Sequence, residues 1–158
     1  MIHQTAIIST KAKIGHNVTI EPYCIIHDNV EIGDNCFVGS FSEIGLPTPL
    51  AQINKLVIGG NSTIRSHSVL YIGSMIGECF STGHYASVRD NSEIGKNVQL
   101  GSRSDIQGDC SIGDYTKMHA DVHIGKCSKI GSYVWLFPEV LLTNDPTPPS
   151  ENLEGVTI

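Results

Sequence analysis

The sequence predicts an all-β domain built from short strands and turns that repeat every six residues. Two observations lead to this fold class. An aliphatic residue recurs at six-residue spacing along most of the chain, and a small or β-branched residue follows it four positions later in most units. An amphipathic helix needs apolar residues about 3.6 positions apart, and a half-buried strand needs period two. Neither explains a period of six, whereas short strands separated by turns do.

The first run of the repeat covers the N-terminal part of the chain. Its aliphatic positions are Ile2, Ile8, Ile14, Ile20, Ile26, Ile32, Val38 and Ile44. Residues 46–57, LPTPLAQINKLV, then break the spacing, and Pro47 and Pro49 cannot donate backbone hydrogen bonds to a strand ladder. We therefore expect one external loop near residues 46–57, either a tolerated surface insertion or a functional lid.

The second run restores the repeat and contains one exception. Its positions are Ile58, Ile64, Leu70, Ile76, Thr82, Val88, Ile94, Leu100, Ile106, Ile112, Met118, Ile124, Ile130, Leu136 and Leu142. Thr82 is the only one of these residues that is not aliphatic, and Phe80 stands in a small-residue slot two positions before it. We expect Phe80 to fill the volume that Thr82 leaves.

The repeat also suggests a division of the chain. Residues 1–142 are expected to form the repetitive body, whereas 143–158 begin as a Pro-rich, non-repetitive segment. The final residues, 156-VTI-158, resemble the start of another unit. We therefore expect the chain to end before further coils.

Composition restricts the possible function. A chain of 158 residues fits one domain, and a net charge of -6 argues against nucleic-acid or anionic-membrane surfaces. The N-terminus lacks the features of a signal peptide, and no long apolar run occurs. The five cysteines are an odd number without CxxC spacing, which favours reduced thiols over a disulfide framework or a zinc site. We expect a soluble cytoplasmic protein with a small-molecule partner, without nucleic acid or membrane.

The six-residue pattern resembles that of the hexapeptide-repeat acyltransferase superfamily. The resemblance implies a left-handed parallel β-helix in which three units form one triangular coil of 18 residues. Residues 18 apart would then be vertical neighbours, about 4.8 Å from coil to coil. Three polar pairs have this spacing: Asp105 with His123, Arg103 with Asp121, and Arg89 with Gln107. Asp105 could hold one tautomer of His123 and raise its basicity, or the two could form a plain surface pair.

Three segments extend the resemblance to a narrower group. They are TGHYASVRD (82–90), residues 94–125, and LLTNDPTPPS (141–150). They resemble bacterial sugar N-acyltransferases of this superfamily that act on nucleotide-linked amino sugars, although Val88 and Asp90 stand where the group more often has Ile and Glu. The resemblance implies a homotrimer that transfers an acetyl group from acetyl-CoA to a sugar amine, in surface polysaccharide biosynthesis, with its ligands in grooves between subunits.

The resemblance assigns roles to individual residues. It implies that His84 and His119 are catalytic or orient the substrate, and that Arg89, Asn144 and Asp145 line the cleft. We add Asp105 and His123 as substrate-binding residues because of their vertical spacing. His84 also follows Gly83, which would let a ligand approach the backbone closely. Gly101, one coil before His119, offers a purely steric alternative, because it would make room for the imidazole ring.

Two other functions remain open at this point. A zinc enzyme like the γ-class carbonic anhydrases would need a His pair two coils apart in one slot, with another His five residues on. His84 and His119 are 35 residues apart, and His119 and His123 are four apart, so the slots do not coincide and no metal is expected. A non-catalytic β-helical scaffold is the second alternative, and it predicts a groove without polar residues.

Overall fold

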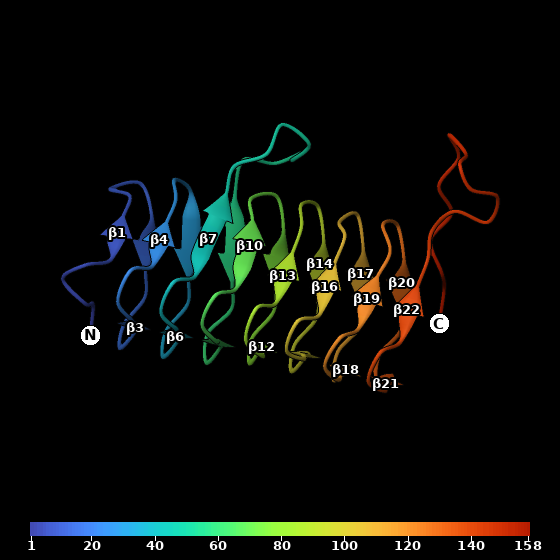
Figure 1. The fold of residues 1–158 in the computed structure, drawn as a ribbon. Coiled ribbons are helices and arrows are strands. Elements are labelled where there is room, and N and C mark those ends of the chain that lie inside the picture. Colours follow the sequence, from blue (N-terminus) through green and yellow to red (C-terminus); the bar gives the residue numbers. More distant parts are fainter.

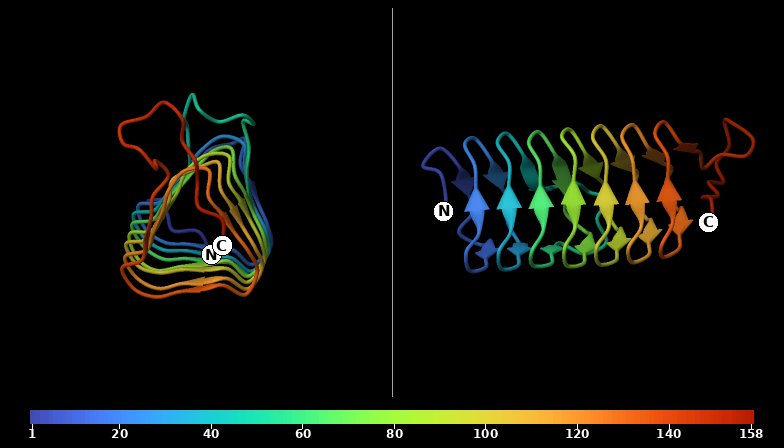
Figure 2. Two further views of the ribbon diagram at one scale, coloured as in Figure 1. Left: turned by 90° about the vertical axis from the view of Figure 1, so that its right-hand side faces the viewer. Right: turned by 90° about the horizontal axis from the view of Figure 1, so that it is seen from below.

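The computed structural model describes residues 1–158 and contains 22 short strands and no helix. The chain winds into a left-handed parallel β-helix with the shape of a triangular prism, which is plainest in the end-on view of Figure 2. Figure 1 shows the coils in sequence order, with the two termini at opposite ends of the prism. The predicted fold class is confirmed. Because the chain forms no helix, it has none with the length and hydropathy of a membrane span.

Three parallel sheets form the sides of the prism, and we name them A, B and C. Sheet A contains β3 (Thr19–Ile20), β6 (Phe37–Val38), β9 (Thr63–Ile64), β12 (Ser81–Thr82), β15 (Gln99–Leu100), β18 (Lys117–Met118) and β21 (Trp135–Leu136). Sheet B contains β1 (Ile7–Ile8), β4 (Ile25–Ile26), β7 (Glu43–Leu46), β10 (Val69–Tyr71), β13 (Ser87–Val88), β16 (Asp105–Ile106), β19 (His123–Ile124) and β22 (Leu141–Leu142). Sheet C contains β2 (Lys13–Ile14), β5 (Val30–Ile32), β8 (Leu56–Ile58), β11 (Met75–Ile76), β14 (Glu93–Ile94), β17 (Ser111–Ile112) and β20 (Lys129–Ile130).

The period of six produces this arrangement directly. Each unit supplies one strand and one turn, so the chain visits sheets A, B and C in rotation and every third strand pairs in parallel. The aliphatic residue of each unit points inward, and 29 buried hydrophobic residues form one continuous core. Most corner turns place a residue at positive φ, for example Asn91 at 56° and Asn97 at 55°. Asn tolerates this left-handed region better than most residues do.

Thr82, the exception in the repeat, packs against the core as expected but also makes a hydrogen bond that the sequence did not predict. Phe80 is 0% exposed and Thr82 is buried, as the predicted exchange of volume requires. The Thr82 hydroxyl accepts a hydrogen bond from the backbone amide of Arg65 at 2.9 Å. The equivalent amide of the next coil, that of Gly83, donates to a backbone carbonyl, that of Leu100, at 2.7 Å. Thr82 therefore changes the ladder as well as the core.

Two loops interrupt the coils, and both leave the prism at the corner between sheets B and C. The first joins β7 to β8 and lies where the sequence predicts it, near residues 46–57. The second follows β22, and the chain then returns to sheet C, where Lys129 pairs with Thr157. Gly131 also donates its amide hydrogen to the carbonyl of Ile158 at 2.7 Å. Figure 2 shows both loops projecting from the same corner.

Candidate functional site

The seven predicted site residues lie in two separate places on the prism. One group lies on sheet B, at the B–C corner and in the loop after β22: Arg89, Asp105, His123, Asn144 and Asp145. The other group lies at the corner between sheets A and B: His84 and His119. The two predicted catalytic histidines therefore lie on a different corner of the prism from the predicted binding residues.

Asp105 and His123 form a hydrogen-bonded pair on the outer face of sheet B. They are register partners on β16 and β19, so their side chains project side by side. Nδ1 of His123 lies 3.1 Å from Oδ1 and 3.0 Å from Oδ2 of Asp105. An ionised carboxylate only accepts hydrogen bonds, so the contact selects the tautomer with the proton on Nδ1. Nε2 of His123 then keeps its lone pair, as a general base requires.

Gln107 extends this pair toward the B–C corner. Its side-chain amide donates a hydrogen bond to Oδ2 of Asp105. The 18-residue spacing places Arg89 one coil away from Gln107, but no hydrogen bond joins their side chains. Asp105 is thus held between Gln107 and His123, which restricts how the imidazole can turn.

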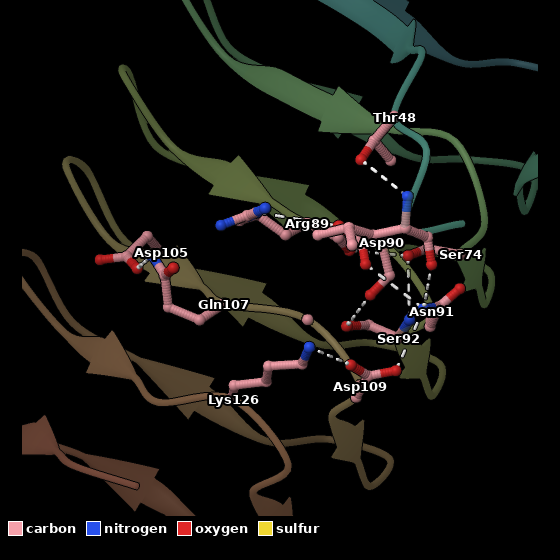
Figure 3. Close-up of polar contacts among 12 residues, drawn as sticks. Thr48, Ser74, Arg89, Asp90, Asn91, Ser92, Asp105, Gln107, Asp109 and Lys126 are labelled. Atoms are coloured by element: carbon pink, nitrogen blue, oxygen red, sulfur yellow. Dashed lines mark hydrogen bonds and ion pairs between the residues drawn. The ribbon is translucent and has the colours of Figure 1, made fainter. Parts of the chain in front are cut away.

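Arg89 follows β13 and extends over the same face, as Figure 3 shows. Its guanidinium carbon lies 5.6 Å from the ring centroid of Tyr71, which is a cation–π distance. Its Nε lies 3.8 Å from Oδ1 of Asp90, and both atoms are buried without a hydrogen-bond partner. Asp90 is only 2% exposed, so its carboxyl group lies below the surface, beside Arg89. The remaining guanidinium N–H groups are available to an anionic ligand on sheet B.

Asn91 connects this site to the first loop (Figure 3). Its Oδ1 accepts the amide hydrogen of Gln52 at 2.8 Å, and its Nδ2 donates to the carbonyl of Leu50 at 3.0 Å. Nδ2 also lies 3.1 Å from Oδ1 of Asp109, whose other oxygen is 3.0 Å from Nζ of Lys126. One side chain therefore fastens the first loop to the turn that carries Arg89.

The second loop contributes Asn144 and Asp145 in different ways. Asn144 lies close to Gly125, because a Cβ atom on that glycine would come within 3.2 Å of Cβ of Asn144. Asp145 accepts the amide hydrogens of Thr147 at 3.0 Å and of Ser150 at 2.9 Å. The hydrogen bond from the Ser150 amide is the main reason that the pKa of the Asp145 carboxyl is lowered. Asp145 thus stabilises its own loop, while Asn144 lies next to the strands of the site.

His84 is exposed on the turn after β12, and its Nδ1 lies 2.8 Å from the Ser66 hydroxyl. A serine hydroxyl can donate or accept, so this contact does not select a tautomer as Asp105 does. Arg89 lies at the opposite end of the same strand, β13, so the sheet separates it from His84.

His119 is exposed after β18 and packs against aromatic rings. Its ring centroid lies 5.6 Å from that of Trp135 and 6.1 Å from that of Phe137. The steric role expected of Gly101 takes a different form. A Cβ atom there would come within 2.2 Å of the backbone carbonyl carbon of His119, so Gly101 makes room for the backbone of the next coil and not for the imidazole ring.

The remaining predicted pair, Arg103 and Asp121, forms a bidentate salt bridge at the A–B corner. Nε and Nη2 of Arg103 lie 2.7 and 2.6 Å from the Asp121 oxygens. This hydrogen bonding raises the pKa of Arg103 and lowers that of Asp121. Nowhere in the chain do three or more His, Cys, Asp or Glu side chains come together as metal ligands.

Three residues of the sheet B site were not predicted from the sequence, namely Tyr71, Asp90 and Asn91. Tyr71 stands 18 residues before Arg89, so the coil length could have identified it. The bond from Asn91 to the loop has no signal in the repeat, because it depends on the path of an insertion that does not follow the period.

Comparisons with known proteins agree with this fold. The family described as bacterial transferase hexapeptide (six repeats) matches residues 11–46 and 91–126. A solved structure of the UDP-N-acetylglucosamine acyltransferase of Francisella novicida superposes on 90% of this chain and 66% of its own, with a TM-score of 0.65 and 21% identity. At that identity the likeness concerns the fold alone.

Two curated relatives carry the same name, acyl-[acyl-carrier-protein]–UDP-N-acetylglucosamine O-acyltransferase. The protein of Thermodesulfovibrio yellowstonii is 30% identical over 143 residues, which cover 72% of this chain and 55% of the relative. That of Rickettsia typhi is 38% identical over 98 residues, which cover 48% of this chain and 37% of the relative. The chain therefore spans about half the length of these relatives or less.

These names correct one expectation. Acetyl-CoA was the predicted acyl donor, but the relatives named here use an acyl group carried by acyl carrier protein. The prediction of the donor is therefore wrong. The prediction of the repeat is confirmed by the matched family segments and by the three-sided coil. Two segments of this chain, residues 11–46 and 91–126, thus match the family described as bacterial transferase hexapeptide (six repeats).

Proposed function

We propose that the protein is an acyltransferase that moves an acyl group from a carrier-protein thioester to a nucleotide-linked sugar. The observation that carries the proposal is the Asp105–His123 pair on sheet B, where a carboxylate orients an imidazole with a free Nε2. The names of the relatives support the classes of donor and acceptor.

In the proposed reaction, His123 acts as the general base. Its Nε2 takes the proton from a hydroxyl or amine of the sugar as that group attacks the thioester carbonyl carbon. The carbon–sulfur bond then breaks, and the imidazolium returns the proton to the leaving thiolate. Asp105 stabilises the imidazolium by accepting the Nδ1 hydrogen, without becoming protonated itself.

Arg89 would bind the phosphate groups of the acceptor. A guanidinium offers paired N–H donors that match phosphate oxygens, and here one side of it is already fixed by Tyr71 and Asp90. Asn144 would approach the same ligand from the second loop. A homotrimer is part of the proposal, and the measured mass of the purified protein in solution tests it.

The activity is tested by release of free thiol from acylated carrier protein in the presence of UDP-N-acetylglucosamine. A parallel reaction with a UDP-linked amino sugar distinguishes an ester product from an amide product. We expect the wild type to release thiol and His123→Gln to lose about a hundredfold or more in rate. His16→Gln, which alters an exposed histidine in the turn after β2, is the control. No turnover with any of these acceptors, or full activity of His123→Gln, would exclude the proposed mechanism.

A further inference from the structure

We infer that the first loop and the N-terminal strands of sheet B together form a binding site for a small amine with an apolar body. The pocket between them has a volume of about 610 Å³, which is within the range of small-molecule sites. It includes β4, which lies five coils, or about 24 Å, from the strand of His123. The inference therefore goes beyond the proposed acyl transfer and does not depend on it.

A pair of outward-facing isoleucines forms the floor of this pocket. Ile7 and Ile25 are register partners on β1 and β4, where Ile7 is 66% exposed and Ile25 is partly exposed. On most other coils of sheet B the same outward position holds a polar side chain, namely Glu43, Ser87, Asp105 and His123. A ligand that covers both isoleucines removes apolar surface from water, which favours binding.

The first loop forms one wall of the pocket through Pro47 and Asn54. This wall is held in place at two points. Asn91 fastens the tip of the loop, and Nζ of Lys55 lies 2.9 Å from Oε2 of Glu31 near its end. A wall that is already fixed lowers the ordering cost of binding. The insertion would thus take part in a site, in addition to being tolerated by the coil.

The charges around the pocket favour a cation over an anion. Its lining contains the carboxylate of Asp28 and no Lys or Arg. Nζ of Lys11 reaches Oδ2 of Asp28 at 2.8 Å from outside the lining. Beside this pair, Nε2 of His27 lies 2.8 Å from Oε1 of Glu43. When the imidazole is neutral, the two carboxylates outweigh the single lysine by one charge, so an ammonium group is attracted and a carboxylate ligand is repelled.

The hydrogen-bonding groups of the lining also suit an amine. A carboxylate only accepts hydrogen bonds, so Nε2 of a neutral His27 donates to Glu43 and Nδ1 keeps its lone pair. Neither this Nδ1 nor the side-chain amide of Asn54 has a hydrogen-bond partner within the protein. An ammonium group has three N–H donors, which match these two acceptors and the carboxylate of Asp28.

Three probes that differ only in their polar group test the inference. We titrate 4-phenylbutylamine, 4-phenylbutanol and 4-phenylbutyrate against the full chain and record the isoleucine methyl resonances and the heat of binding. The amine should bind saturably and shift the resonances of Ile7 and Ile25. The alcohol should bind about tenfold more weakly because it lacks the charge, and the carboxylate more weakly still. Ile7→Ser should weaken binding of the amine about tenfold through loss of apolar contact.

Ile53→Ser is the matched control, since Ile53 is a 45% exposed isoleucine of the first loop that does not line the pocket. We expect this variant to bind the amine like the wild type. Three outcomes would overturn the inference: no saturable binding, equal effects of Ile7→Ser and Ile53→Ser, or binding of 4-phenylbutyrate as tight as that of the amine. His123→Gln should leave amine binding unchanged, so failure of the acyl-transfer proposal is recognised separately.

Discussion

The hydroxyl of Thr82 accepts the backbone amide hydrogen of Arg65 at 2.9 Å, in the slot where other units carry an aliphatic side chain. A buried hydroxyl needs a hydrogen-bond partner, and a backbone amide supplies it without any new polar side chain in the core. Thr82 thereby avoids an unpaired buried oxygen, and Phe80 supplies the apolar volume on the same coil.

The exchange of volume between Phe80 and Thr82 predicts strong coupling in a double-mutant cycle. Phe80→Ala should lower the free energy of unfolding by about 3–5 kcal/mol, because it leaves a cavity. Thr82→Ile should lower it by about 1–3 kcal/mol through overpacking. The double variant should lose less than the sum, since isoleucine fills part of the cavity. Denaturant unfolding of the four proteins measures the coupling, and strictly additive losses would contradict the exchange.

The contacts of Asn91 predict that one side chain controls the first loop. Asn91→Ala removes the hydrogen bonds to Leu50 and Gln52 and should cost about 1–3 kcal/mol more than Asn97→Ala. The comparison is fair because both asparagines have nearly the same positive φ, so both variants share the backbone cost. Hydrogen exchange should become faster at Gln52 in Asn91→Ala only. Equal stability and equal exchange in the two variants would show that the loop is held by other contacts.

The second loop is expected to depend on pH through Asp145. Hydrogen bonding, chiefly from the Ser150 amide, holds the pKa of this carboxyl below its ordinary value of 3.8. A carboxyl with a depressed folded-state pKa adds stability above its ordinary pKa and loses it as the pH falls through the folded value. The amide resonances of Thr147 and Ser150 should therefore shift in acid below pH 3.8. Asp145→Asn should abolish this shift, and an identical titration in that variant would refute the assignment.

The cysteines should differ sharply in reactivity. Burial raises the pKa of the thiols of Cys24, Cys36 and Cys110, whereas Cys79 is exposed. Because the thiolate is the reactive species, a thiol reagent at neutral pH should modify Cys79 first and leave the three buried thiols intact until unfolding. Mass spectrometry of the partly modified protein checks the order. Cys79→Ser also removes the exposed thiol from the background of a thiol-release assay.

The coil could be predicted from the sequence because it repeats one local rule many times. The spacing of 18 residues also gave the contact between Asp105 and His123, which needs only the register and no knowledge of the loops. His84 and His119 were predicted from a resemblance, and they lie on a different corner of the prism. A shared repeat fixes the positions of residues but does not by itself assign their roles. Their assignment as catalytic residues stays a prediction.

The details around Asp90 could not be predicted, for a physical reason. In the preceding coil the equivalent position holds Ile72, which is also buried although it lies outside the aliphatic slots of the repeat. Whether a carboxylate in that place turns outward or inward depends on the neighbouring side chains of Arg89 and Asn91. Such contacts do not repeat from coil to coil, so the sequence pattern does not reveal them. The acyl donor likewise cannot be inferred from the spacing of apolar residues.

The two loops leave the prism at the same corner, and every coil has the same height. The distance between the loops is therefore a whole number of coil heights. From β7 to β22 there are five steps, or about 24 Å. Gain or loss of one whole coil between them would lengthen or shorten this distance by about 4.8 Å while leaving each loop and its anchor unchanged. Span between the loops is thus a property that evolution or an engineer can alter in discrete increments, separately from the chemistry on the faces.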